Sequence, residues 1–250
     1  MQAVGLTNET RRDNFTVQEF TNFGDIVWKY DGYIEEEGTL WFLHYKLASN
    51  KELATTWYWF FNIFNVKVFT KDDFVNALDG YVNYNIESGE VAISSLEDDF
   101  TCLINTYIPR RKTHPEKVSP ENTIDCPLGV LNLIDIIDSK KKFYKKVILR
   151  KESVHPLIIY AVMLDRYEKD ESITNNEVKI ASLLNDSCNI GKIFTMDLNI
   201  LNYYLDTLQD LGYLKVVRTA GLDVVKLDTS LRSEEILVKY YEELNTVGLR

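Results

Sequence analysis

Apolar residues recur at helical spacing in the first part of the chain. Between Thr39 and Ser49 the apolar positions predict a helix that breaks near Asn50. A second helix, aromatic on almost every side, is predicted from Ala54 onward. Because a short polar turn joins the two, we expect an antiparallel pair of helices, with the second helix buried between layers.

The aromatic residues of this pair include Trp41, Trp57 and Trp59, which fall within nineteen positions. Large aromatic side chains are usually buried, so the favoured interpretation is packed core. The alternative is a platform on which the bases of a nucleic acid stack. The stretch is too short to span a bilayer, and charged residues interrupt it.

Two more helices are expected before residue 110. Thr70 is expected to cap a helix over Lys71–Val82. Ser95, followed by Asp98, approximates a capping box for a helix over Leu96–Ile108. The N-terminal part of the chain is therefore expected to be helical throughout.

The pattern after residue 152 predicts three helices followed by a β-hairpin. The helices are expected over Pro156–Tyr167, Thr174–Leu184 and Met196–Leu211, and the strands over Tyr213–Arg218 and Asp223–Leu227. This order is typical of a winged helix, a fold that binds either DNA or protein. The third helix carries three Asp residues and no Lys or Arg, which favours protein. We expect a mainly α protein with a multi-helical N-terminal lobe and a C-terminal winged helix.

Composition sets limits on the class of protein. With 250 residues, of which 45% are hydrophobic, the chain is long enough for two cores. We expect a helical lobe over 1–109, a connecting segment over 110–151 and a winged-helix-like domain over 152–250. Three cysteines, with no signal peptide and no transmembrane run, indicate a reduced, cytoplasmic protein without a membrane partner.

Charge is unevenly distributed along the chain. The net charge is −10 over residues 1–109, +6 over 110–151 and −6 over 152–250. Indiscriminate binding of nucleic acid is not expected of a chain whose total is −10. The basic part in the middle is the exception, because it separates two acidic parts.

The densest positive charge lies in Ser139–Lys151, here called the basic strip, which contains no acidic residue. Phe143 and Tyr144 stand among its lysines, an arrangement that suits a strip tracking phosphates with stacking side chains. The candidate nucleic-acid-binding residues are Lys140, Lys141, Lys142, Lys145, Lys146, Arg150, Lys151 and, outside the strip, Lys192. The alternative is a solvated face at a domain junction.

Candidate catalytic and metal-binding groups are sparse. Cys102, His114 and Cys126 have side chains that ligate metals, but their spacing forms no close pair, so no metal site is predicted. Cys102 is expected in the core, and Cys126 under a turn. Acidic pairs occur at Asp98–Asp99 and within Glu35–Glu37, yet no catalytic residue is assigned.

Four stretches identify a family resemblance. They are GTLWFLHYKLASNKELATTWYWFFNIF at Gly38–Phe64, DDFTCLINTYIP at Asp98–Pro109, TIDCPLGVLNLI at Thr123–Ile134 and GYLKVVRTAGLDVVKL at Gly212–Leu227. In residue identity and spacing they resemble the bacterial domain-of-unknown-function family DUF4007. Its best-understood members are the SspB-like proteins of DNA phosphorothioation and phage defence. From about Phe20 the resemblance covers most of the chain.

The resemblance implies a context. SspB-like proteins act with a cysteine desulfurase, a PAPS-reductase-like enzyme and an ATPase, which together replace a non-bridging phosphate oxygen of DNA with sulfur. A DNA-nicking role is described in the family, and a divalent metal would be its cofactor. Members usually begin with a further helical segment, whereas this chain starts at MQAVGL and is expected to lack that segment. Nicking is therefore not carried over.

The sequence thus supports a DNA-engaging or scaffolding component of a phosphorothioation and defence system, with DNA and the three sulfur-transfer proteins as partners. The alternative is an adaptor that recruits those enzymes without touching DNA. A free-standing metal nuclease is a third and less favoured interpretation, because the residues form no recognisable metal-binding motif.

Overall fold

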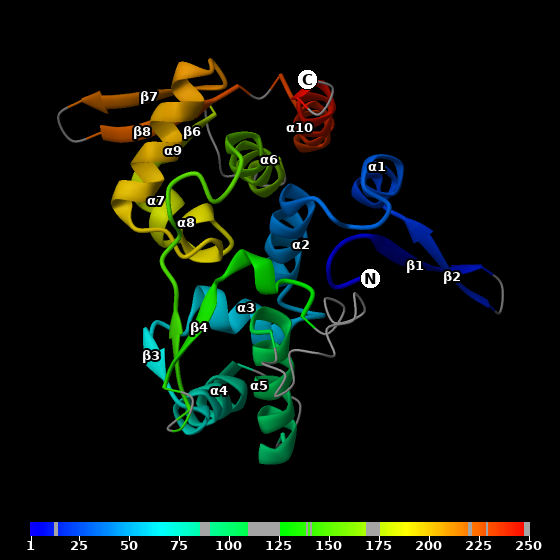
Figure 1. Ribbon diagram of the computed structural model, residues 1–250, viewed down its shortest axis with the longest axis vertical. Coiled ribbons are helices and arrows are strands. Elements are labelled where there is room, and N and C mark those ends of the chain that lie inside the picture. The colour runs from blue at the N-terminus through cyan, green and yellow to red at the C-terminus, as the bar shows by residue number, and fades with distance from the viewer. Residues whose placement is uncertain are drawn as a thin grey trace, which may run out of the picture.

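The computed structural model describes residues 1–12, 15–85, 91–109, 126–138, 140, 142–168, 176–219, 222–228 and 230–247. Helices make up most of its regular structure, and three small antiparallel sheets accompany them (Figure 1). The expected mainly α class is therefore corrected to a mixed α and β fold. The strands lack a strong alternation of apolar and polar residues, so few of them could be predicted from the sequence. Backbone pairing holds them in place.

The helices are α1 (Asn22–Tyr30), α2 (Glu37–Ser49), α3 (Thr55–Asn62), α4 (Lys71–Asn85), α5 (Ile93–Tyr107), the 3₁₀ turn η3 (Gly129–Leu131), α6 (Pro156–Tyr167), α7 (Ile180–Asn185), α8 (Ile190–Ile193), α9 (Leu198–Asp210) and α10 (Ser233–Val247). The strands are β1 (Thr7–Arg12), β2 (Phe15–Phe20), β3 (Val68–Phe69), β4 (Ile134–Asp138), β5 (Phe143–Lys146), β6 (Glu177–Lys179), β7 (Leu214–Thr219) and β8 (Leu222–Leu227). Their sheet orders are β1-β2, β3-β5-β4 and β6-β8-β7.

The predicted helix pair is confirmed as α2 and α3, which pack on each other. The helix after Thr70 is confirmed as α4, and its first turn is capped by a reciprocal contact between Thr70 and Asp73. The predicted capping box was wrong. Helix α5 starts at Ile93, so Ser95 lies inside its first turn and caps nothing.

The hairpin β1-β2 was not predicted and extends away from the body of the molecule (Figure 1). Most of its side chains are exposed, so its sequence has no buried face to produce an alternating pattern. It is held instead by six opposed residue pairs and by polar contacts such as that between Thr10 and Glu19. The expectation that residues before 110 are helical throughout is therefore wrong.

The C-terminal part keeps the predicted order of its main elements but differs in three places. The short helix α8 and the last helix α10 were not predicted, and the second predicted helix is replaced in part by a strand. Helices α6 and α9 and the hairpin β7-β8 lie where the pattern indicated. Within the predicted helix Thr174–Leu184, however, residues 177–179 form the strand β6, which pairs with β8. Backbone pairing with the hairpin outweighs the weak helical pattern there, and the helix begins only at Ile180. Residues 174 and 175 lie outside the described part of the chain.

Helix α2 occupies the centre of the molecule (Figure 1). One contiguous set of buried apolar side chains includes residues of α2 and of both ends of the chain. Trp41 and Trp59 are each 2% exposed, which confirms that they are core and excludes base stacking for both. Trp57 is half-buried against the same core. Trp59 packs edge-on against Phe74, with the ring centroids 5.1 Å apart.

His44 ties α2 to two distant segments. Its Nε2 lies 2.9 Å from the backbone oxygen of Ile193, and its Nδ1 lies 2.8 Å from the hydroxyl of Tyr107. A carbonyl oxygen only accepts, so Nε2 carries the proton and Nδ1 accepts from the tyrosine. Complete burial lowers the pKa of His44 to about 4, despite the opposing effect of the Ile193 carbonyl.

The last helix closes the fold over the start of α2. The backbone N–H of Gly38 donates to the hydroxyl of Tyr240 at 3.1 Å, and the hydroxyls of Thr39 and Tyr241 lie 2.6 Å apart. Tyr241 also stacks on Tyr30 of α1, with the ring centroids 5.3 Å apart. Helix α10 therefore packs against α1 and α2 as well as against α6.

Replacing Trp59 by alanine is expected to lower the free energy of unfolding by about 3–5 kcal/mol, because a large buried ring leaves a cavity. The matched control is Trp28→Ala, since Trp28 is 68% exposed and should change stability by about 0.5 kcal/mol or less. Chemical denaturation of both variants measures the difference. Equal stabilities would show that Trp59 is not part of the core.

The neutral state of His44 predicts an acid-sensitive fold. Because its folded pKa is depressed to about 4, its contribution is fully present above the unfolded value of 6.5 and is lost as the pH falls through about 4. Between those pH values the wild type should lose about 3 kcal/mol more than His44→Gln does. Denaturation curves at a series of pH values measure this; parallel curves for the two proteins would contradict it.

Candidate nucleic-acid interface

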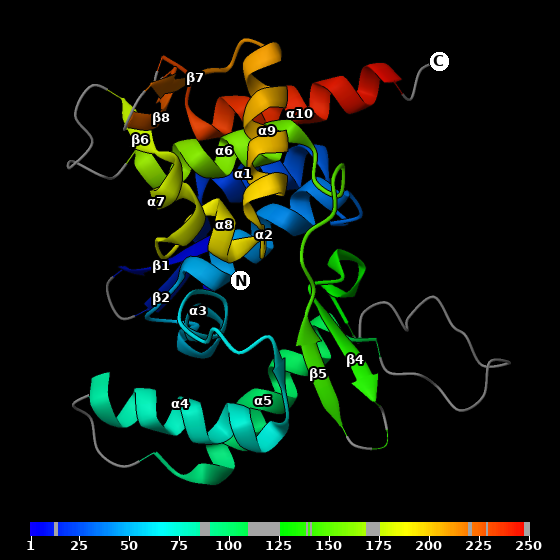
Figure 2. The ribbon, with the colours of Figure 1, turned by 90° about the vertical axis from the view of Figure 1, so that its left-hand side faces the viewer.

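The basic strip lies along β5 and the extended segment that follows it. Strand β5 is the middle strand of the sheet β3-β5-β4, and the chain after it rises to α6 (Figure 2). Of the strip, residues 139 and 141 are outside the described part of the chain, so the prediction for Lys141 remains untested.

Lys140, Lys142 and Lys145 lie at the β4-β5 hairpin. The side chains of the first two are exposed, and Lys145 is half-exposed. Lys145 pairs with Asp135 across the hairpin at 3.2 Å, an exposed pair of the kind that contributes about 0–1 kcal/mol. This pair is too weak to withhold the ammonium from a phosphate. The hairpin therefore presents three adjacent cations.

Lys146 points inward instead. Its ammonium donates to the backbone oxygens of Phe60 and Phe64 at the C-terminal end of α3, and lies 4.3 Å from the centre of the Phe60 ring. Burial lowers the pKa of Lys146 to about 7, and the nearby charge of Lys192 acts in the same direction. The two carbonyls and the ring favour the ammonium, so Lys146 closes the end of a helix.

The two aromatic residues of the strip differ in position. Tyr144 stacks on Phe69 and lies edge-on to Phe100, with centroid distances of 5.9 and 5.4 Å, and burial raises the pKa of its hydroxyl. It is part of the packing under the sheet. Phe143 is half-buried. Interleaved aromatics in this strip thus serve the core at one position at least, rather than stacking on bases.

The remaining candidates lie farther along. Arg150 is exposed and Lys151 lies over the Tyr203 ring, 5.3 Å from its centre. Lys192 donates to the side-chain oxygen of Asn65 at 2.9 Å and lies close enough to Lys146 to affect its pKa. The structure therefore brings Lys192 to the buried end of the strip, while Arg150 and Lys151 continue its outer side.

A cavity of about 230 Å³ lies beside Arg150. It is here called the Trp41 cavity, and it is lined by Glu37, Trp41, Val130, Leu131, Asn132, Leu133, Val147, Ile148, Leu149, Arg150 and Ser153. Glu37 was named from the sequence only within an acidic group without a role, and Asn132 was missed. The signal was present in the position of Asn132 after Gly129–Leu131, since asparagine is a common left-handed terminator, and its φ is indeed +51°.

A larger and shallower depression of about 480 Å³ lies on the side of α2 that faces α6. In it, Lys46 forms a salt bridge with Asp165 at 2.7 Å, and Tyr45 donates to the same carboxylate at 2.8 Å. The charge of Lys46 is thus neutralised by a partly buried partner. Cys188 lines the same depression, and burial raises the pKa of its thiol.

The acidic and thiol candidates are scattered. Asp99 accepts a hydrogen bond from Thr56 at 2.5 Å, so it is engaged in packing α5 on α3. Cys102 is exposed, which makes its predicted core position wrong, because the apolar stripe of α5 runs through Leu103 instead. Cys126 lies under the turn at Gly129 as expected, with burial raising the pKa of its thiol. His114 lies outside the described residues.

Within the described ranges, no three His, Cys, Asp or Glu side chains come together in a way that could hold a metal ion. The same ranges contain no helix long and apolar enough to cross a membrane. The solvent-facing cations of the strip are Lys140, Lys142, Lys145, Arg150 and Lys151, here called its outer side. Together with the Trp41 cavity beside Arg150, they form the candidate binding surface.

Comparison with known proteins gives the family. The model of DUF4007, a protein family of unknown function, matches residues 1–241, and the chain belongs to that family. The fold is similar to two solved structures described as "Magnesium ion-bound SspB crystal structure" and "SspB crystal structure". Each has a TM-score of 0.81 at 22% identity, and the match covers 96% of this chain and 73% of the other. Among curated proteins, none matches significantly.

The opposite placements of two neighbouring lysines yield a prediction. Lys146→Ala should lower the free energy of unfolding by about 2 kcal/mol, because the helix-end carbonyls of Phe60 and Phe64 lose a charged donor. Lys145→Ala, next to it in sequence, should change stability by less than about 1 kcal/mol. Thermal and chemical denaturation compare the two. A stable Lys146→Ala protein would mean that the ammonium is not needed at that helix end.

Proposed function

We propose that this protein is a DNA-engaging or scaffolding component of a bacterial DNA phosphorothioate modification and phage-defence system. Membership of the DUF4007 family and the fold shared with SspB structures support that context. The proposed partners are DNA and the cysteine desulfurase, PAPS-reductase-like and ATPase components of such a system. The DNA contact is assigned to the outer side of the basic strip.

One observation carries the DNA contact. Five cationic side chains, Lys140, Lys142, Lys145, Arg150 and Lys151, follow one another along a hairpin and the extended segment after it, with their charged ends toward solvent. Within the described residues, Asp135 is the one acidic side chain that forms an ion pair with any of them. A row of cations with so little acidic pairing is typical of a surface that binds a phosphate backbone.

The acidic remainder of the chain restricts how DNA approaches. The flanking parts have net charges of −10 and −6, so a polyanion is repelled from most of the surface. The strip attracts it, and this attraction would orient the duplex along β5. Each phosphate neutralised should contribute about −0.9 to the slope of log affinity against log salt concentration, and five contacts would give about −4 to −5.

The C-terminal part is proposed to be a winged helix that docks on protein. In support, α6, α7, α8 and α9 are followed by the hairpin β7-β8, and β6 pairs with β8 in the order β6-β8-β7. The wing cation Arg218 is engaged by Asn202 at 2.9 Å and by Asp206 at 3.3 Å on α9. With α9 itself acidic, this unit offers little attraction to phosphate.

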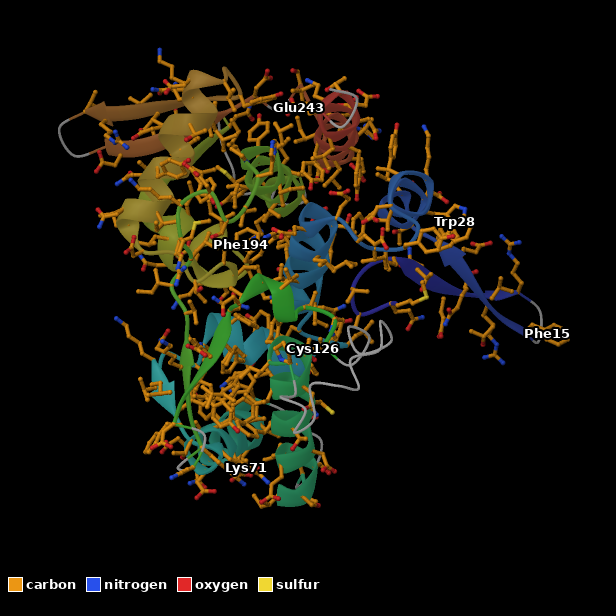
Figure 3. The ribbon with its side chains drawn as sticks, in the orientation of Figure 1. Phe15, Trp28, Lys71, Cys126, Phe194 and Glu243 are labelled. Atoms are coloured by element: carbon orange, nitrogen blue, oxygen red, sulfur yellow. The ribbon has the colours of Figure 1, made fainter. Side chains whose placement is uncertain are left out.

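A second candidate function, that of a protein adaptor, is favoured by the hairpin β1-β2. Phe15 at its outer end is 75% exposed (Figure 3). Phe20, the last residue of β2, stacks on Trp28 of α1 with the ring centroids 6.0 Å apart. Exposed aromatic side chains of this kind are enriched where proteins bind each other. Binding through them would persist at salt concentrations that abolish a phosphate contact.

The triple change Lys140→Glu, Lys142→Glu and Lys145→Glu tests the DNA role, with Lys146 left intact because of its structural contacts. Binding to a short duplex, measured by fluorescence anisotropy, should fall below detection, because the changes turn attraction for phosphate into repulsion. The melting temperature should move by no more than about 2 °C, since exposed charges contribute little to stability.

The matched control is Lys29→Glu, Lys51→Glu and Arg232→Glu, which makes the same change in net charge at exposed positions outside the strip. It should retain most of the affinity of the wild type. If both triple variants bind DNA as well as the wild type, the strip is only a solvated face. The adaptor function would then be the better account of this protein.

A further inference from the structure

We infer that the Trp41 cavity receives one unpaired nucleobase from DNA held on the basic strip. The inference rests on the proposed DNA contact, because the backbone must lie along the strip for a base to reach the cavity. It adds a class of ligand to that contact, namely a nucleotide that has left the base stack.

The walls combine apolar side chains with a surface that is mostly polar. The cavity has a volume of about 230 Å³, and polar atoms make up more of its exposed lining than apolar atoms do. Its apolar lining residues are Val130, Leu131, Leu133, Val147, Ile148 and Leu149. Ligand sites in proteins are typically concave, with polar groups that fix orientation. A nucleobase combines a flat ring with a hydrogen-bonding edge, so it suits a site whose walls offer both apolar side chains and polar atoms.

The rim carries polar groups of both kinds. Arg150 offers donors, Glu37 offers acceptors and the amide of Asn132 offers both. All three are exposed, and no hydrogen bond or ion pair joins any of their side chains to another described residue. In particular, Arg150 and Glu37 do not pair with each other across the cavity. The edge of a base, which alternates donors and acceptors, complements such a rim.

The cavity is already formed without a ligand. The indole N–H of Trp41 donates to the backbone oxygen of Ser153 at 3.1 Å, which fixes the ring in the cavity wall. The backbone N–H of Val147 donates to the backbone oxygen of Leu133 at 2.9 Å, which joins the two chain segments that line the cavity. The left-handed backbone of Asn132 directs the chain from η3 into β4. A base would therefore enter without a free-energy cost for rearranging the walls.

Arg150 connects the cavity to the strip. Arg150 belongs to the basic strip and also lines the cavity, so a phosphate that it binds lies beside the cavity. The chain segment that carries Arg150 runs from β5 toward α6 (Figure 2). The guanidinium can bind the phosphate that flanks an extruded nucleotide. The side chains of Val130 and Ile148 are 57% and 49% exposed, and they offer apolar contacts to an entering base.

Two duplexes of equal length test this inference, one fully paired and one with a single bulged thymine. The wild type should bind the bulged duplex about tenfold more tightly, in line with the contribution of one sequestered base. Val130→Phe should fill the mouth and abolish this preference, while the affinity for the paired duplex stays unchanged. The conservative control Val130→Thr should keep the preference.

A second variant guards against misfolding of the first. Asn132→Asp keeps a residue that tolerates the left-handed backbone but replaces the amide by a second carboxylate, and should reduce the preference severalfold with an unchanged melting temperature. The triple strip variant should lose affinity for both duplexes together. This separates the cavity from the strip.

The outcomes are distinct. If the wild type binds both duplexes equally, or if neither cavity variant changes the ratio, the cavity does not receive a base, and the DNA role of the strip stands. If the wild type binds neither duplex, the proposed DNA contact fails and the inference fails with it. A preference for the bulge that disappears in Val130→Phe and persists in Val130→Thr supports it.

Discussion

The structure depends on one buried imidazole that has to stay neutral. His44 is completely buried at the centre of α2, and its two nitrogens reach Tyr107 at the end of α5 and the backbone of Ile193 in α8. One side chain thus joins the N-terminal helices to the C-terminal part. Burial favours the neutral imidazole more strongly than the hydrogen bond to the Ile193 carbonyl favours the charged one, so His44 stays neutral. The aromatic rings around it, Phe61 and Phe194, exclude the water that would otherwise stabilise the charge.

The basic strip has an inner and an outer side, and its neighbouring lysines show how the two are divided. Lys146 contacts the end of α3, whereas Lys145 reaches solvent and pairs with Asp135. Alternation along β5 produces this division, since successive side chains of a strand point to opposite faces. Lys146 therefore anchors the strand to α3, and Lys145 is available to a ligand. The same anchoring keeps the Trp41 cavity beside the strip, because the chain after β5 has a fixed starting point.

Sequence patterns predicted the elements that have strong local signals. The aromatic helix pair, α4 after its Thr70 cap and the β7-β8 hairpin were all recognisable, because periodicity and capping are properties of neighbouring residues. The hairpin β1-β2 and the strand β6 were not, since exposed or very short strands have no buried face to mark them. For the candidate site, the cluster of lysines was visible in the sequence, but the inward direction of Lys146 was not. The Trp41 cavity joins Glu37, Asn132 and Arg150 from separate parts of the chain, and only tertiary packing brings such residues together.

The tyrosine contacts of α10 have a consequence for synthesis of the protein. The first turn of α2 receives its polar partners from Tyr240 and Tyr241, about two hundred positions later in the chain. While the chain is still on the ribosome, the N–H of Gly38 and the hydroxyl of Thr39 have neither partner, although α2 is the centre of the core. Contacts between such distant residues form late and slow the search for the native state. The core of this protein is thus completed only when the C-terminal helix has left the ribosome and docked on α1 and α2.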